Sequence, residues 1–229
     1  MKYIIAVLLI LCLLFVFSCK ESSRINHTKV VDVINPITER TWMDRNLGAN
    51  QVAISSTDSL AFGDLYQWGR SDDGHQIRKS DTTSVLSSSS TPDHEKFILV
   101  SVAPGEPWNW FEDLNDNIWQ GINGVNNPCP NGYRLPTEAE WEEEIQSWNS
   151  RNAIGAFNSV LKLPLGGSRS SSNGSIGSTG SNGSYWTSDV EGPFARALSI
   201  DDRSSGLTSS LRAIGLSVRC IKKKESEVQ

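Results

Sequence analysis

The sequence predicts a single α+β domain with small antiparallel sheets, one or two short helices and long irregular loops. Residues 137–148 combine helix-start signals with apolar residues at helical spacing. Several runs of three to six residues, bounded by Gly, Pro or Asn, have the character of short strands. Residues 69–93 and 104–128 are polar and aperiodic, so we expect two long loops. A chain of 229 residues with 38% hydrophobic and 21% charged residues suits one domain, or at most two small ones.

The first 18 residues have the pattern of a signal peptide. One positive charge precedes an apolar run over residues 3–17, which is short for a membrane-spanning helix. The run ends in Val16-Phe17-Ser18-Cys19, which resembles a bacterial lipobox, and Lys20-Glu21 resembles the surface-export signal of lipoproteins in Bacteroides-like Gram-negative bacteria. We therefore expect a signal peptide over 1–18, a lipid on Cys19 and a tether over 19–29. Cleavage elsewhere, or an uncleaved anchor, are the alternatives.

Short strands and one helix are expected in the first half of the domain. The strands are, in order, Val30–Ile34, Thr41–Met43 and Phe97–Val102. Asp44-Arg45-Asn46 suits a buried or half-buried polar lock between loops, with ligand contact as the alternative. Apolar residues within Leu60–Trp68 recur at helical spacing and predict a short helix, although Gly63 weakens it by about 1 kcal/mol.

The clearest local signals belong to a central helix over 137–148. Thr137 and Glu140 form a capping box, in which each side chain bonds the other residue's main-chain N–H. Trp141, Ile145 and Trp148 then recur at i, i+4 and i+7, which places them in a single apolar stripe on an acidic helix. We expect this helix to pack its two indoles onto a core.

Shorter elements follow the central helix. A second helix is expected over 153–161, a strand over 162–165, and a flexible Gly- and Ser-rich loop over 166–184. Three antiparallel strands are then expected at Gly183–Ser188, Ala195–Ile200 and Leu211–Cys220. Asp201-Asp202 is typical of a hairpin tip. The folded domain should therefore span 30–222, with a charged tail over 223–229.

Five motifs, in order along nearly the whole domain, resemble one family, the Fibrobacter succinogenes major paralogous domain (FISUMP). They are TWMDRNLGA at 41–49, FGDLYQWGR at 62–70, NNPCPNGYRLPTEAEW at 126–141, GSYWTSD at 183–189 and GLSVRC at 215–220. RLPTEAEWE also resembles a core helix of formylglycine-generating and C-type-lectin-like domains. The resemblance implies a C-type-lectin-like fold and a location at the outer membrane or cell surface of a Gram-negative bacterium. It implies no mechanism, because the family has no agreed activity.

The cysteine count points to one disulfide. Cys12 leaves with the signal peptide and Cys19 takes the lipid, which leaves Cys129 and Cys220 in a protein that enters an oxidising compartment. A bridge between them would contribute on the order of 4–5 kcal/mol in the chain-entropy model. Two buried free thiols, or a reactive cysteine, are the alternatives. A formylglycine-generating activity needs reactive late thiols, and Cys220 is the only late one.

Other chemistries find little support in the sequence. The His residues are scattered, no CxxC or GxSxG motif occurs, and the one Lys run lies in the tail, so zinc, hydrolase chemistry and nucleic acid are not expected. Calcium remains a possible cofactor because Asp113-x-Asn115-x-Asn117 begins like an oxygen-ligand loop, but Ile118 stands where an EF-hand needs Gly. Solvated loop acids are the simpler interpretation.

These observations favour a non-catalytic surface module that binds a glycan or a protein. Its long loops are rich in Trp, Asn and Asp, and aromatic faces beside amides and carboxylates suit sugar rings. The candidate ligand-binding residues are Trp108, Trp110, Asn115, Asp116 and Trp119. These indoles could instead fill the domain's own core. A structural or fimbria-like subunit is the main rival function.

Overall fold

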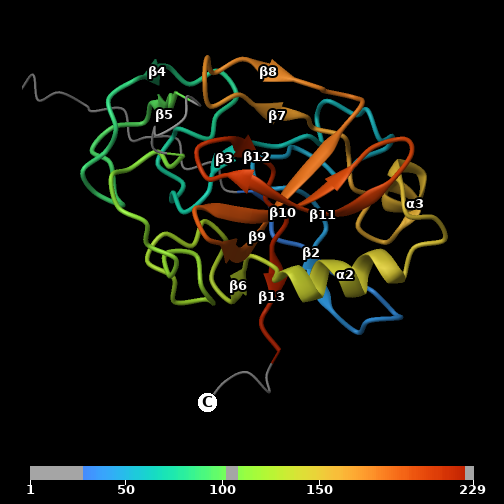
Figure 1. The fold of residues 1–229 in the computed structure, drawn as a ribbon. Helices are drawn as coiled ribbons and strands as arrows, with labels where there is room; N and C mark the ends of the chain where they lie inside the picture. Colours follow the sequence, from blue (N-terminus) through green and yellow to red (C-terminus); the bar gives the residue numbers. More distant parts are fainter. Residues whose placement is uncertain (1–27, 102–107, 225–229) are drawn as a thin grey trace, which may run out of the picture.

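A computed structural model describes residues 28–101 and 108–224 of the chain, and it confirms a fold of small, mostly antiparallel sheets with two short helices (Figure 1). The expected signal peptide and Cys19 lie outside the described residues. Among the residues that are described, no helix has the length and apolar character needed to cross a membrane.

Four small sheets make up the β-structure. The first has the order β1 (Asp32–Ile34), β2 (Thr41–Met43), β13 (Ile221–Lys222) and β6 (Tyr133–Arg134). The second has the order β11 (Ser205–Leu211), β10 (Phe194–Ile200) and β9 (Gly183–Glu191). The third has the order β3 (Tyr66–Gln67), β12 (Gly215–Leu216), β7 (Ser168–Arg169) and β8 (Ile176–Gly177). The fourth pairs β4 (Thr82–Thr83) with β5 (Phe97–Ile98) in parallel, which the sequence did not predict.

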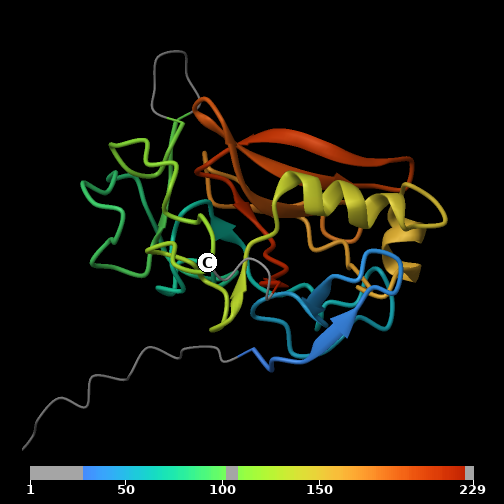
Figure 2. The ribbon, with the colours of Figure 1, turned by 90° about the horizontal axis from the view of Figure 1, so that it is seen from below.

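The central helix forms as expected and fixes the position of the second sheet. Helix α2 runs over Glu138–Gln146 with Thr137 as its N-cap, and both bonds of the capping box are present. The helix lies along one side of the β9–β10–β11 sheet (Figure 2). Its Trp141 ring packs 4.8 Å from the Trp42 ring of β2 and 5.7 Å from the Tyr185 ring of β9, measured between ring centroids. One helix thus joins two sheets.

The core consists of two clusters rich in aromatic residues. One cluster, beneath the long loops, contains Trp68, Trp110, Trp119 and Trp186, and the other, beside α2, contains Trp42, Trp141 and Trp148. Seven of the eight Trp residues are therefore buried. Because an indole buries a large area, these residues supply much of the core that such short strands cannot supply alone.

A disulfide joins Cys129 to Cys220, as the cysteine count predicted. Its Cα atoms lie 5.9 Å apart and the two residues are separated by 91 positions. Cys220 directly precedes β13, and β13 pairs with β6, so the bridge ties the turn before β6 to the end of the domain.

The Asp44-Arg45-Asn46 segment forms the expected polar lock. The buried Asn46 side chain accepts hydrogen bonds from Arg219 Nε (3.0 Å) and Nη2 (2.9 Å) and donates one to the Phe62 carbonyl oxygen (3.0 Å). Asp44 pairs with its neighbour Arg45 through two bonds. Three chain segments that are distant in sequence are thereby held together.

The helix predicted over Leu60–Trp68 is wrong. Gly63 has a φ of +70°, which ends any helical run, and the donors that follow it bond to distant segments. Leu65 N–H donates to the Gln76 carbonyl oxygen and Trp68 N–H to the Arg212 carbonyl oxygen. The apolar spacing reflects burial on several sides of an irregular segment rather than one helix face.

Several expected elements after α2 differ in extent. Helix α3 covers Ala153–Asn158, and no strand forms over 162–165, where Lys162 has a φ of 49°. The 166–184 segment holds the β7–β8 hairpin instead of being only a loop. The third strand of the β9–β10–β11 sheet is Ser205–Leu211, not the predicted Leu211–Cys220. The predicted strand does not form as one element, because a turn separates β11 from β12. Strand β5 is also shorter than the predicted Phe97–Val102 strand.

Candidate functional site

Two of the expected ligand-binding indoles lie in the core. Trp110 and Trp119 are both 0% exposed. Trp110 Nε1 donates to the Trp68 carbonyl oxygen (2.6 Å), and Trp119 Nε1 donates to the Asn126 carbonyl oxygen (2.8 Å). The expectation that these residues contact a ligand is therefore wrong. A long loop with few strand partners needs buried side chains to hold it, and an indole supplies both apolar area and an N–H for a loop carbonyl.

The other three expected residues lie outside the buried core, and each makes a contact of its own within the described chain. Trp108 is half-buried and stacks on Phe194, with ring centroids 5.0 Å apart. Asn115 is exposed, and its side-chain oxygen accepts from the Asn117 N–H. Asp116 forms an ion pair with the buried Arg212 at 2.6 Å, an interaction that fastens the loop to the core. None of these residues lines any of the concave regions described next.

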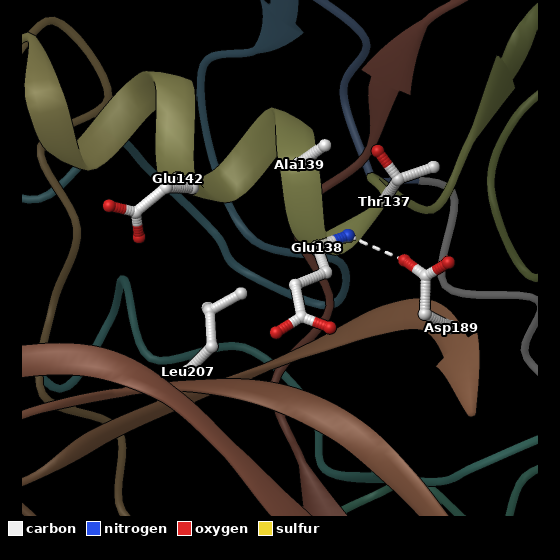
Figure 3. A pocket seen from close by; sticks show the side chains of 6 residues that line it. All are labelled: Thr137, Glu138, Ala139, Glu142, Asp189 and Leu207. Atoms are coloured by element: carbon white, nitrogen blue, oxygen red, sulfur yellow. Dashed lines mark hydrogen bonds between the residues drawn. The ribbon is translucent and has the colours of Figure 1, made fainter. Parts of the chain in front are cut away.

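The first concave region is an acidic groove between α2 and the β9–β10–β11 sheet, shown in Figure 3. It has a volume of about 590 Å³ and is lined by Thr137, Glu138, Ala139, Glu142, Asp189 and Leu207. Its carboxylates already have partners within the described structure. Asp189 accepts from the Glu138 main-chain N–H at the start of α2, as Figure 3 shows, which places a negative charge at the positive end of the helix.

The remaining carboxylates of the acidic groove are paired with arginines. Glu138 accepts two bonds from Arg196, at 2.7 and 3.1 Å, and Glu142 accepts one from Arg151 at 2.8 Å. These bonds join α2 to β10 and to the segment before α3. The acidic groove is thus explained by the docking of α2, without a ligand.

A second concave region, which we name the neutral cleft, lies where the β1–β2 turn meets the end of α2 and helix α3. It has a volume of about 210 Å³, and it is lined by Asn35, Pro36, Ile37, Ser147, Trp148, Asn149, Gly155, Asn158, Ser159 and Val160. None of these side chains is charged. The lining instead combines amides and hydroxyls with apolar groups, and Ile37 is 70% exposed at the rim.

A single buried carboxylate organises the neutral cleft. Glu144 of α2 is 0% exposed, and its Oε2 accepts from Asn35 Nδ2 at 2.7 Å while its Oε1 accepts from Trp148 Nε1 at 3.1 Å. Asn35 also donates to Ser147 Oγ at 2.9 Å. Burial raises the pKa of Glu144, an effect that the Asn35 and Trp148 hydrogen bonds partly offset. Glu144 thereby fixes the orientation of an amide and an indole in the cleft wall.

The sequence contains weak signals for this cleft. Asn35-Pro36 predicts only a turn, although Asn35 is buried and its side-chain oxygen accepts from the Ile37 N–H. Glu144 stands four residues before Trp148, so it lies on the apolar stripe of α2 rather than on its acidic face. A carboxylate on an apolar stripe was the feature that could have marked the cleft.

A third concave region of about 280 Å³ is lined by Gln120, Gly121, Ile122, Asn123, Arg134 and Lys223. Arg134 makes two bonds to Glu140, at 2.7 and 2.8 Å, in support of the capping box. Its guanidinium therefore already has a structural partner, and the region offers a weaker case for a ligand site than the neutral cleft.

The only buried histidine in the described part of the chain is also a structural group. His75 Nδ1 lies 2.6 Å from Asp73 Oδ1, and its Nε2 accepts from the Gln67 main-chain N–H at 3.0 Å. Burial and the charge of Arg70 lower the pKa of His75 to about 4, against the effect of Asp73. With both ring nitrogens bonded, His75 cannot act as a general base without breaking the structure. The described residues also contain no group of three or more His, Cys, Asp or Glu able to hold a metal ion.

Comparisons with family models, with curated proteins and with solved structures found no match to this chain.

Proposed function

We propose that the protein is a non-catalytic binding module of C-type-lectin-like, FISUMP type, and that it binds an uncharged glycan in the neutral cleft. The observation that carries the proposal is the lining of that cleft, in which no side chain is charged although 21% of the chain is charged. We further propose that a lipid on Cys19 anchors the module to the outer membrane and displays it at the cell surface. Its ligand is then a glycan, free or on a surface protein, that meets it outside the cell.

The chemistry of the cleft suits a sugar. Asn and Ser side chains both donate and accept hydrogen bonds, which matches the hydroxyl groups of a carbohydrate. The apolar rim at Ile37 and Val160 offers surface to the C–H faces of a sugar ring. A charged ligand would find no counter-ion in the lining, so specificity should favour neutral sugars.

The arrangement favours binding over catalysis. The nearest carboxylate, Glu144, is fully buried behind Asn35 and Trp148, and both of its oxygens already accept hydrogen bonds. A formylglycine-generating activity is disfavoured because Cys220, the only late cysteine, is bonded to Cys129. We also propose that binding requires no calcium, since no carboxylate lines the cleft.

Glycan-array screening with and without calcium tests this proposal. Asn158→Ala removes an amide of the cleft, and we expect it to weaken binding about 2- to 10-fold, the value of one hydrogen bond. Asn115→Ala is the matched control, because it removes an exposed amide from the 108–119 loop. Loss of binding in Asn115→Ala but not in Asn158→Ala would move the site to that loop. Absence of binding to any glycan would refute the proposal.

A structural or assembly subunit is the second candidate function. It is favoured by one observation, the open outer edge of the β9–β10–β11 sheet, whose β11 strand carries no charged residue. This role needs no cleft, and it is tested separately below.

A further inference from the structure

Strand β11 presents an open main-chain edge. It is the outermost strand of its sheet and pairs only with β10, over seven residue pairs. Figure 2 shows it in red-orange at the outer margin of the molecule. In an antiparallel ladder, alternate residues direct their N–H and C=O groups away from the partner strand. Within the described ranges, no hydrogen bond from outside β10 reaches the main chain of residues 205–210.

The edge of β11 lacks the features that normally protect such an edge. Native edge strands are usually short, or they carry Lys, Pro, a bulge or inward-pointing charge. β11 has seven residues, all small, hydroxylic or aliphatic: Ser205, Gly206, Leu207, Thr208, Ser209, Ser210 and Leu211. Strand β1, at the margin of another sheet, has only three residues, and its Asp32 is paired with Lys222. Strand β11 is thus the more suitable of the two edges for adding a strand.

We propose that β11 is a docking edge for a second copy of this chain, paired antiparallel about a two-fold axis at Thr208. An isologous contact requires a surface that complements itself, and an antiparallel strand pair has that symmetry. An axis at Thr208 pairs all seven residues, places the two exposed Thr208 side chains opposite each other, and sets Leu207 opposite Ser209 of the second copy.

Charge favours a second copy at this edge over contact through other faces. The chain has a formal net charge of −5, so two copies repel each other at most approaches. Along β11 no side chain is charged, so the two-fold pairing sets no like charges directly opposite each other on the two paired strands. The result is a continuous six-stranded sheet, and each dimer carries two neutral clefts.

Sedimentation velocity on residues 20–229, over a range from about 1 to 200 µM, tests the pairing. We expect a reversible monomer–dimer equilibrium, because one strand pair of seven residue pairs buries less surface than a permanent interface does. Thr208→Lys should shift the dissociation constant upward by at least 10-fold, and Thr208→Val should leave it within about 3-fold. Thr91→Lys, at an exposed loop threonine, is the matched charge control and should dimerise as the unchanged chain does.

A cysteine scan along β11 tests the register. In the proposed pairing the two copies of residue 208 have Cα atoms about 4.5–5.5 Å apart, within disulfide range. Residue 205 of one copy instead lies opposite residue 211 of the other. The two copies of residue 205 are therefore six positions apart along the strands, a distance of about 20 Å. Thr208→Cys should therefore form an intermolecular disulfide on oxidation, and Ser205→Cys should not.

A monomer at every concentration would overturn the inference, as would a dimer unaffected by Thr208→Lys or a cross-link at 205 but not at 208. Capture of a different chain by β11, with no self-association, would equally overturn it. Glycan binding that persists in a monomeric Thr208→Lys variant would leave the proposed function intact, so the two proposals fail independently.

Discussion

Mild acid should destabilise the domain through His75. The imidazole is 0% exposed, accepts from the Gln67 N–H at Nε2 and therefore carries its proton at Nδ1, toward Asp73. A second proton would have to displace the Gln67 N–H and would add a buried positive charge beside Arg70. This is why burial, with Arg70 next in effect, lowers the pKa of His75 to about 4 from its ordinary value of 6.5.

The sign and size of the effect follow from proton linkage. Between pH 6.5 and pH 4 the unfolded chain binds a proton at His75 and the folded chain does not, so stability falls as the pH falls. The full difference corresponds to roughly 3 kcal/mol, of which about 2 kcal/mol should be lost between pH 7 and pH 5. Most carboxylates remain ionised in this interval, so His75 should dominate the change.

Urea unfolding at pH 7, 6 and 5 measures this loss, with His75→Gln as the comparison. The Gln side-chain oxygen can still accept from the Gln67 N–H, but the substitution also removes the ring contact with Tyr66. The comparison therefore rests on the change in stability with pH in each protein and not on their absolute stabilities. Glu144, whose pKa is raised by burial, contributes in the opposite direction, with stability lost as the pH rises. Its effect is common to both proteins and cancels. An equal decrease in stability in both proteins, within about 0.5 kcal/mol, would refute the assignment to His75.

Two further predictions concern the covalent and local supports of the fold. Reduction of Cys129–Cys220 should lower the free energy of unfolding by about 4–5 kcal/mol, because it frees a loop of 91 residues in the unfolded chain. Denaturant unfolding curves with and without reductant measure this loss of stability. A loss below about 1 kcal/mol would contradict the prediction. Thr137→Ala should cost about 1 kcal/mol, because Thr137 Oγ1 no longer accepts from the Glu140 N–H. Thr137→Ser, which keeps the acceptor, should recover most of that stability, and equal losses in the two variants would argue against the capping role.

Elements with strong local signals could be predicted from the sequence alone. The capping box at Thr137 and Glu140 needs only residues three positions apart, so it formed as predicted at the start of α2. Strands β1 and β2 were also located, because Asn35-Pro36 separates two short extended runs. Cysteine counting identified Cys129 and Cys220, since only one pairing remained once the early cysteines were assigned.

Features that depend on distant partners could not be predicted in the same way. Leu60–Trp68 has helical spacing, but no local signal reveals that the Leu65 N–H bonds to the Gln76 carbonyl oxygen across a turn. Strand β11 could not be located because SGLTSSL has little strand propensity, and its pairing with β10 supplies the missing stability.

The candidate site shows the same division between local and tertiary information. The sequence by itself predicted loops rich in aromatic, amide and acidic residues. Only the tertiary structure placed Trp110 and Trp119 in the core and brought Asn35 to Glu144, 109 positions away. The physical reason is that burial and long-range hydrogen bonds depend on how the loops close over the core, and no local pattern of residues encodes that closure.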